Sequence, residues 1–87
     1  MKKFYYTPKQ YNEMEALSFH LFVLRFREED EFIKEDIRKT VKYQFDLLDE
    51  LKIPYWVQNE IIFYTEQKLK YKYSLKNYLA NVNIFPK

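Results

Sequence analysis

"LSFHLFVLRF", residues 17–26, decides the fold of this chain. At helical spacing its large apolar side chains point in nearly every direction, and a helix that is apolar all round is normally buried. With Met14, these residues form two opposite stripes, Met14, Leu17, Leu21 and Leu24 on one side and Phe19, Val23 and Phe26 on the other. We therefore expect this helix to need neighbours on at least two sides, from the same chain, a second copy or a partner protein.

Local signals predict where the first two helices begin and end. Thr7 followed by Pro8 and Gln10 is typical of a helix start, because threonine caps, proline suits the first helical position and glutamine completes a capping box. The first helix is predicted at 8–27. Asp30 can cap a second helix at 31–51, which has one apolar face with Ile33, Ile37, Val41, Leu48 and Leu51. Phe32, Tyr43 and Leu47 lie off that face.

The last third of the chain predicts two shorter helices separated by a break. Pro54 starts a helix at 54–68, in which Val57, Ile61 and Tyr64 are in register. An unbroken helix would carry Lys68 and Lys72 into its own apolar stripe, so we expect it to end there. Ser74 can cap a final helix at 74–82. The alternating segment 68–73 is left open as strand, loop or helix.

These elements predict an all-α fold, a small antiparallel bundle of three to four helices. The whole chain, 1–87, is expected to form one helical domain, with residues 1–6 as a loosely ordered basic and aromatic arm. The alternative is an α+β fold with one short strand pair. In that fold the segment 68–73 would pair with 19–26 or with the N-terminal arm.

The composition excludes several classes of protein. The chain has no glycine and no cysteine, which excludes glycine-built phosphate loops, disulfides and thiolate metal sites. No apolar run is long enough to cross a membrane, and the start lacks the apolar core of an export signal, so we expect a cytoplasmic protein. The nine tyrosines, eight phenylalanines and one tryptophan fit either binding surfaces or the codon bias of an A/T-rich genome.

Charge is segregated along the chain. Residues 1–27 carry a net charge of +3, residues 28–51 carry −5 and residues 52–87 carry +4, which together give the overall +2. This distribution suits helices that pack against one another, copies that associate, or an external partner.

No constellation typical of catalysis is present, so we do not expect an enzyme, a cofactor, a bound metal or a small-molecule substrate. The single histidine, His20, is expected to be a hydrogen-bonded core or interface residue rather than a catalyst. The acidic run 28–31 lacks the alternating oxygen ligands and the glycine of a calcium loop. We interpret it as a solvated helix junction.

The leading functional hypothesis is a small protein-interaction module. The aromatic residues that we expect to contact a partner are Tyr55, Trp56, Phe63 and Tyr64, residue types that dominate the energetics of interfaces. Such a module could be a regulatory or inhibitory subunit, of the kind encoded by phages or mobile elements, or a homo-oligomer, most simply a dimer.

The alternative hypothesis is nucleic-acid binding by the segment 64–78. Its candidate residues combine phosphate-neutralising cations with rings that could stack on bases: Lys68, Lys70, Tyr71, Lys72, Tyr73 and Lys76. Against this hypothesis, the segment has no arginine, and the acidic second helix would repel a phosphate backbone. We therefore rank it second.

Overall fold

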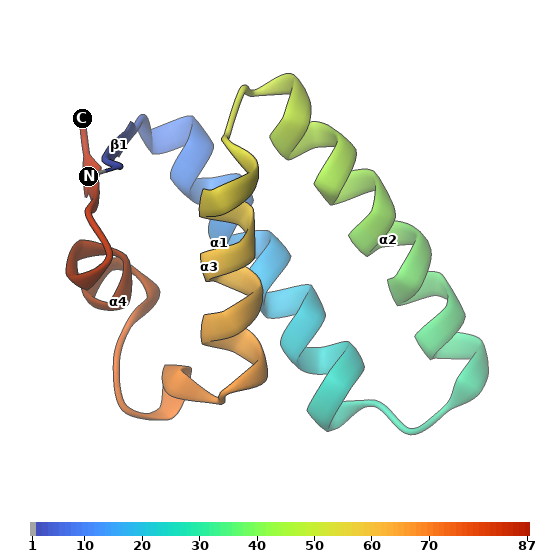
Figure 1. Cartoon of the computed structure of the whole chain (residues 1–87). Helices are drawn as coiled ribbons and strands as arrows, with labels where there is room; N and C mark the ends of the chain where they lie inside the picture. Colours follow the sequence, from blue (N-terminus) through green and yellow to red (C-terminus); the bar gives the residue numbers. More distant parts are fainter. Residues whose placement is uncertain (1) are drawn as a thin grey trace.

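The computed structural model describes residues 2–87, which form four α-helices and one pair of short strands (Figure 1). In chain order the elements are β1 (Phe4–Tyr6), α1 (Pro8–Phe22), the π-helical turn η1 (Val23–Arg27), α2 (Glu31–Glu50), α3 (Tyr55–Glu66), the 3-10 turn η2 (Leu69–Tyr71), α4 (Leu75–Asn81) and β2 (Ile84–Pro86). The predicted helical bundle is confirmed. The four predicted helices correspond to α1 with η1, α2, α3 and α4.

The helix starts follow the predicted caps. The Gln10 amide donates to Thr7 Oγ1 at 3.1 Å and the Thr7 amide donates to Gln10 Oε1 at 2.8 Å, which completes the capping box. Ser74 Oγ accepts from the Asn77 amide at 3.1 Å at the start of α4. These bonds satisfy amides that have no partner within their own helices.

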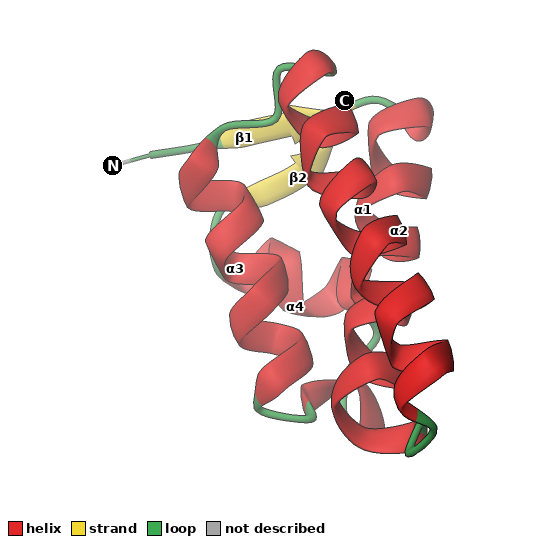
Figure 2. Ribbon diagram, turned by 90° about the vertical axis from the view of Figure 1, so that its right-hand side faces the viewer, coloured by secondary structure: helices red, strands yellow, loops and turns green. Residues whose placement is uncertain are grey.

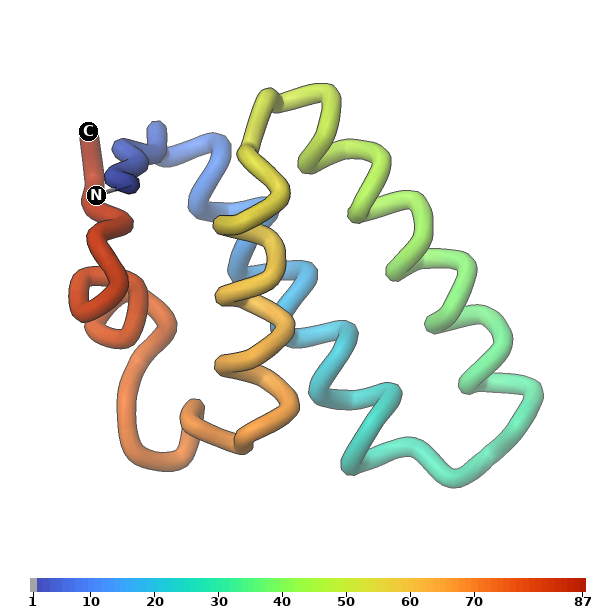
Figure 3. The backbone as a smooth tube through the Cα atoms, viewed as in Figure 1, coloured from blue at the N-terminus to red at the C-terminus, as the bar shows by residue number. Residues whose placement is uncertain are grey.

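The first helix ends in a wider turn than an α-helix. In η1 the Glu28 amide donates to the Val23 carbonyl at 2.9 Å, five residues back. Figure 3 follows the chain from this turn through the short loop 28–30 into the antiparallel helix α2. The predicted end of the first helix near residue 27 therefore coincides with the end of η1.

The chain makes left-handed turns without glycine. Positive φ angles occur at Lys52 (61°), Lys68 (57°) and Asn83 (65°), each just beyond the end of a helix. The left-handed conformation costs an ordinary L-residue about 1 kcal/mol, because its Cβ approaches the following carbonyl. Lys68 in this conformation ends α3, and η2 follows, so the predicted break is a tight turn rather than a strand.

Replacing Lys52 by glycine is expected to raise the free energy of unfolding by about 0.5 to 1 kcal/mol. Glycine relieves the left-handed strain at this exposed position, although it also makes the unfolded chain more flexible. Urea denaturation measures the change. Lys52→Ala is the matched control, since alanine keeps Cβ and should give no gain; equal stabilisation by both would contradict this account.

The two strands near the ends of the chain pair with each other, so residues 4–6 are not part of a loose arm as predicted for 1–6; Met1 lies outside the described residues. β1 and β2 are parallel, with Phe4 opposite Ile84 and Tyr6 opposite Pro86. Figures 1 and 2 show the two terminal segments side by side. Tyr6 and Ile84 are buried in the core. A strand pair is thus present, as in the alternative fold class, but at 4–6 and 84–86 rather than at 68–73.

Helix α1 packs against both α2 and α3, which supplies the two neighbours predicted for residues 17–26. The main core contains Tyr6, Met14, Leu17, Val41, Leu48, Ile53, Val57, Ile61, Tyr64, Leu75, Leu79 and Ile84. The burial of residues 17–26 is nevertheless incomplete, because Phe19 is 56% exposed and Arg25 is also exposed. Within residues 2–87, no helix has both the length and the apolar character that crossing a membrane requires.

Candidate functional site

Helix α2 carries two apolar stripes, and only one of them packs against the rest of the chain. The inner stripe packs on α1, and its residues Val41, Gln44 and Leu48 are buried. All three lie in the second half of the helix, while residues 31–40 contain no buried side chain. The second stripe, which we call the outer stripe, consists of Phe32, Tyr43 and Leu47, together with Ile33. The sequence pattern places Ile33 on the inner face, but in the first half of α2 the inner face is not buried and Ile33 is exposed.

Three of the four residues of the outer stripe are exposed, and Leu47 is half-buried. Phe32 is 89% exposed, Tyr43 is 65% exposed and Ile33 is 46% exposed. Phe32 and Tyr43 are eleven residues apart, about three helical turns, so both rings project from nearly the same side of the helix. Helix α2 forms one side of the molecule, and α4 and the strand pair lie on the other (Figure 1).

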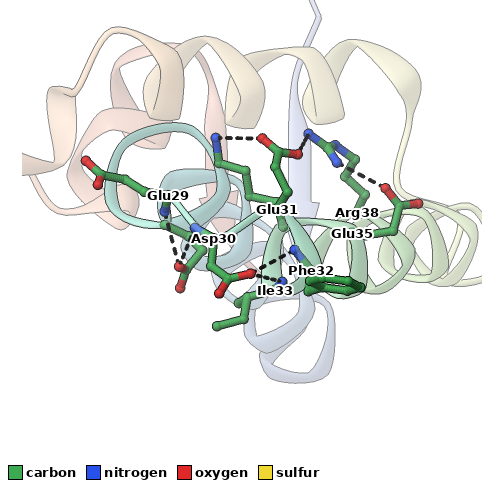
Figure 4. Close-up of polar contacts among 9 residues, drawn as sticks. Glu29, Asp30, Glu31, Phe32, Ile33, Glu35 and Arg38 are labelled. Atoms are coloured by element: carbon green, nitrogen blue, oxygen red, sulfur yellow. Dashed lines mark hydrogen bonds and ion pairs between the residues drawn. The ribbon is translucent and has the colours of Figure 1, made fainter.

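The start of α2 is held in place by its acidic cap. Asp30 Oδ1 accepts from the Phe32 amide at 2.8 Å and from the Ile33 amide at 3.3 Å. Glu28 Oε1 accepts from the amides of Glu29 and Asp30, so the preceding loop is ordered as well. Figure 4 shows these bonds beside the Phe32 ring and the Ile33 side chain. The acidic run 28–31 therefore caps the helix and presents Phe32 from a defined backbone.

An ion-pair network occupies a different flank of α2. Glu31 lies 3.7 Å from both Lys34 and Arg38, and Arg38 donates to Glu35 at 3.0 Å (Figure 4). Glu31, Glu35 and Arg38 are substantially exposed, whereas Lys34 is 26% exposed, and exposed ion pairs contribute little to stability. The outer stripe itself is interrupted by Asp36 and Thr40, so it is amphipathic rather than continuously apolar.

The four predicted partner-binding residues on α3 do not form one surface. Tyr64 is 3% exposed, and its hydroxyl donates to the Tyr73 carbonyl at 2.7 Å. This corrects the prediction for Tyr64, whose helical register with Val57 and Ile61 already indicates a core position. Tyr55 is 76% exposed, Trp56 is partly covered by the Lys2 ammonium 5.9 Å above its ring, and Phe63 stacks near Tyr78.

The predicted nucleic-acid residues are partly brought together on the end of α1. The Lys70 ammonium lies 3.9 Å from the centre of the Phe22 ring, and Lys68 lies 4.6 Å from that of Phe26. The Tyr71 ring meets Phe22 edge-on at 5.6 Å.

The other members of this predicted set lie apart or stay free. Lys76 lies on α4, over the Tyr11 ring at 5.4 Å. Lys72 and Tyr73 are exposed. Three of the four predicted lysines therefore cover aromatic rings of their own chain, an arrangement stabilised by cation–π attraction.

His20 makes the polar contact expected of a structural histidine. Its Nδ1 lies 2.9 Å from Gln44 Oε1, and because an amide oxygen can only accept, the imidazole donates. This bond links α1 to α2 beside the inner stripe. Among residues 2–87, no three His, Asp or Glu side chains are arranged to hold a metal ion.

Four tyrosines that pack into the core have raised pKa values. Burial is the main cause at Tyr6, Tyr11, Tyr64 and Tyr78. Burial and the Glu60 carboxylate, 3.5 Å from the hydroxyl, raise the pKa of Tyr78 to about 12. The phenols must therefore stay protonated for the core to remain packed.

This arrangement predicts a loss of stability in alkali. The unfolded chain releases tyrosine protons near pH 10, whereas the native state holds the Tyr78 proton up to about pH 12. The stabilisation is therefore complete below pH 10 and is lost as pH rises toward 12. Urea midpoints measured from pH 8 to 11.5 should fall, and less steeply for Tyr78→Phe. Tyr43→Phe, an exposed tyrosine, should follow the unmodified protein; an identical slope for Tyr78→Phe would contradict this.

Comparison with known proteins identifies no relative: no protein-family model matches the chain, and no curated protein or solved structure is significantly similar to it. The functional argument therefore depends on the geometry of the surfaces described above.

Proposed function

We propose that this protein is a small, non-enzymatic interaction module that binds a partner protein through the outer stripe of α2. The observation that carries the proposal is the exposure of Phe32, Ile33 and Tyr43 along one side of a capped, twenty-residue helix. An amphipathic helix that offers apolar anchors at such spacing is a common way to fill a groove on another protein. The anchor residues proposed here replace the α3 quartet predicted from the sequence.

The fold of the chain supports this choice of surface. The other exposed rings are either isolated, like Tyr55, or backed by neighbouring rings and lysines, like Tyr71. Phe32 is the most exposed of the large apolar side chains in residues 2–87. Exposed aromatic side chains of this size contribute strongly to binding when a partner buries them.

The charge of α2 indicates the chemistry of the partner. Helix α2 carries a net charge of −2 and the loop 28–30 before it adds −3, so a partner groove with a basic rim would be complementary. A second copy would have to place its own basic ends against α2. The simplest twofold dimer, with α2 packed against α2, would instead bring together two copies of residues 28–51, each with a net charge of −5. We therefore propose a different protein as the partner, with a regulatory or inhibitory role as the expected use of such a small module.

Photo-cross-linking tests the proposal in cells that naturally produce the protein. A benzophenone amino acid at position 43 should give one defined adduct, and the same group at position 55 should not. Phe32→Ser and Tyr43→Ser should each weaken binding to the captured protein about 30-fold or more, with little change in melting temperature, whereas Tyr55→Ser should be silent. Binding lost through Trp56→Ala but kept in Phe32→Ser would favour the α3 surface instead. Sedimentation would reveal whether the captured protein is a second copy of this chain, a result that would contradict a different protein as the partner.

Single-stranded nucleic acid is a second candidate, favoured by two exposed rings near Lys70: Phe19, whose ring centre is 6.0 Å from the Lys70 ammonium, and Tyr71, the next residue in the chain. Binding there should weaken steeply with salt, since each neutralised phosphate releases counterions. Tyr71→Ala should reduce affinity about 5-fold or more through lost stacking. Salt-insensitive or absent binding of labelled oligonucleotides would remove this candidate.

A further inference from the structure

A cleft of about 400 Å³ opens where α1, α2 and α3 diverge. Its walls come from the end of α1 and η1, the first half of α2 and the end of α3. The lining residues are Leu21, Leu24, Arg25, Lys34, Arg38, Thr65 and Glu66. The cleft therefore combines an apolar wall with three cationic side chains and one carboxylate.

The sequence of α2 explains why the cleft exists. Leu48, Phe45 and Val41 follow one another at steps of three and four residues along the side of α2 that packs on the bundle. The same line continues to Arg38 and Lys34. Because charged side chains are not buried without full compensation, this half of the helix cannot close against its neighbours as the apolar half does.

The positive charge in the cleft is only partly compensated. Arg38 donates to Glu35 at 3.0 Å, and Glu31 lies 3.7 Å from both Lys34 and Arg38, but these carboxylates belong to side chains that are 60% and 74% exposed. Water screens such pairs effectively. Within residues 2–87, no carboxylate lies within 4.0 Å of Arg25. The lining thus has three cations against the single carboxylate of Glu66.

We infer that this cleft binds a small phosphate monoester. A dianionic phosphate matches the net charge of the lining, whereas a carboxylate would leave one positive charge uncompensated. Two guanidinium groups can donate paired hydrogen bonds to phosphate oxygens, and Lys34 adds a compact charge. Leu21 and Leu24 offer an apolar wall to the remainder of the ligand. The volume lies within the range of small-molecule sites.

Phenyl phosphate tests the inference directly. Added to the ¹⁵N-labelled full chain near neutral pH, it should shift amide resonances of residues 21–25, 34–38 and 65–66 in a saturable way. Benzoate, with one negative charge, should bind at least about 5-fold more weakly, and phenol, which is neutral, should leave these resonances unchanged. Saturable shifts confined to other residues, or equal affinity for phenyl phosphate and benzoate, would overturn the inference.

Charge-removing variants separate the cleft from general surface attraction. Arg25→Gln and Lys34→Gln should each weaken phenyl phosphate binding about tenfold. Lys39→Gln removes the same charge from the exposed face of α2 and should change affinity less than twofold. Well-dispersed amide spectra will show whether each variant is folded. If only one of Arg25→Gln and Lys34→Gln folds, that variant alone is enough for the test. Equal losses in Lys34→Gln and Lys39→Gln would show a non-specific effect and overturn the assignment.

Discussion

Replacing Leu17 by alanine is expected to lower the free energy of unfolding by about 3 to 5 kcal/mol. Leu17 is fully buried, and it lies on α1, the helix that packs against both α2 and α3. Removing its side chain loses apolar burial and leaves a cavity that two rigid neighbours cannot close. Since small domains are stable by only 5 to 15 kcal/mol, this single change should visibly shift the urea midpoint.

Two further variants serve as comparisons for Leu17→Ala. Lys39→Ala, on the exposed side of α2, should change stability by less than about 0.5 kcal/mol. Leu21→Ala, at a partly buried position one turn further along α1, should fall between the two. A loss at Leu17 no larger than that at Lys39 would show that α1 does not organise the core.

The helices could be predicted from the sequence because their signals are local. Thr7, Asp30 and Ser74 each cap the helix that follows, and the apolar period of α2 fixes its buried face. The break after Lys68 was likewise predictable, because its charge conflicts with the apolar stripe. The left-handed conformation of Lys68 could not be predicted, since no glycine marks it in the sequence.

Elements that depend on distant pairing could not be predicted in the same way. Each strand is only three residues long, too short for an alternating pattern, and the two lie at opposite ends of the chain. The η1 turn has no sequence signal that we can identify. It contains Phe26, whose ring, like those of Phe19 and Phe22 near the end of α1, lies close to a lysine of segment 68–73.

The candidate site was partly visible in the sequence. Phe32, Tyr43 and Leu47 lie off the inner stripe of α2. The helical pattern therefore allowed two outcomes for them: they could widen the contact between α2 and the bundle, or they could be exposed. Their exposure is decided by tertiary packing, since only an arrangement in which α1 and α3 lie on one side of α2 leaves the other side free. The cationic cleft also depends on tertiary packing, because Lys34 and Arg38 line a cleft only where α1 and α3 lie opposite them.

Replacing Ile84 by alanine is expected to destabilise the protein by about 2 to 5 kcal/mol, although this residue is only three positions from the observed end of the chain. Ile84 is fully buried in the same core as Met14 and Leu79, and β2 pairs with β1 around it. The Phe4 amide donates to the Asn83 carbonyl at 3.0 Å, and the Lys87 amide donates to the Tyr6 carbonyl at 2.8 Å. Loss of the Ile84 side chain should weaken both the core and this pairing.

Tyr5→Ala is the matched control, because Tyr5 lies on the exposed side of the same strand pair and should cost less than about 1 kcal/mol. Hydrogen exchange gives an independent measurement. The amides of Phe4 and Lys87 should be protected in the unmodified protein and exchange faster in Ile84→Ala, because both donate across the strand pair. Unprotected amides together with a silent Ile84→Ala would mean that the ends are loose, as the sequence pattern predicts, and that the helices alone hold the fold.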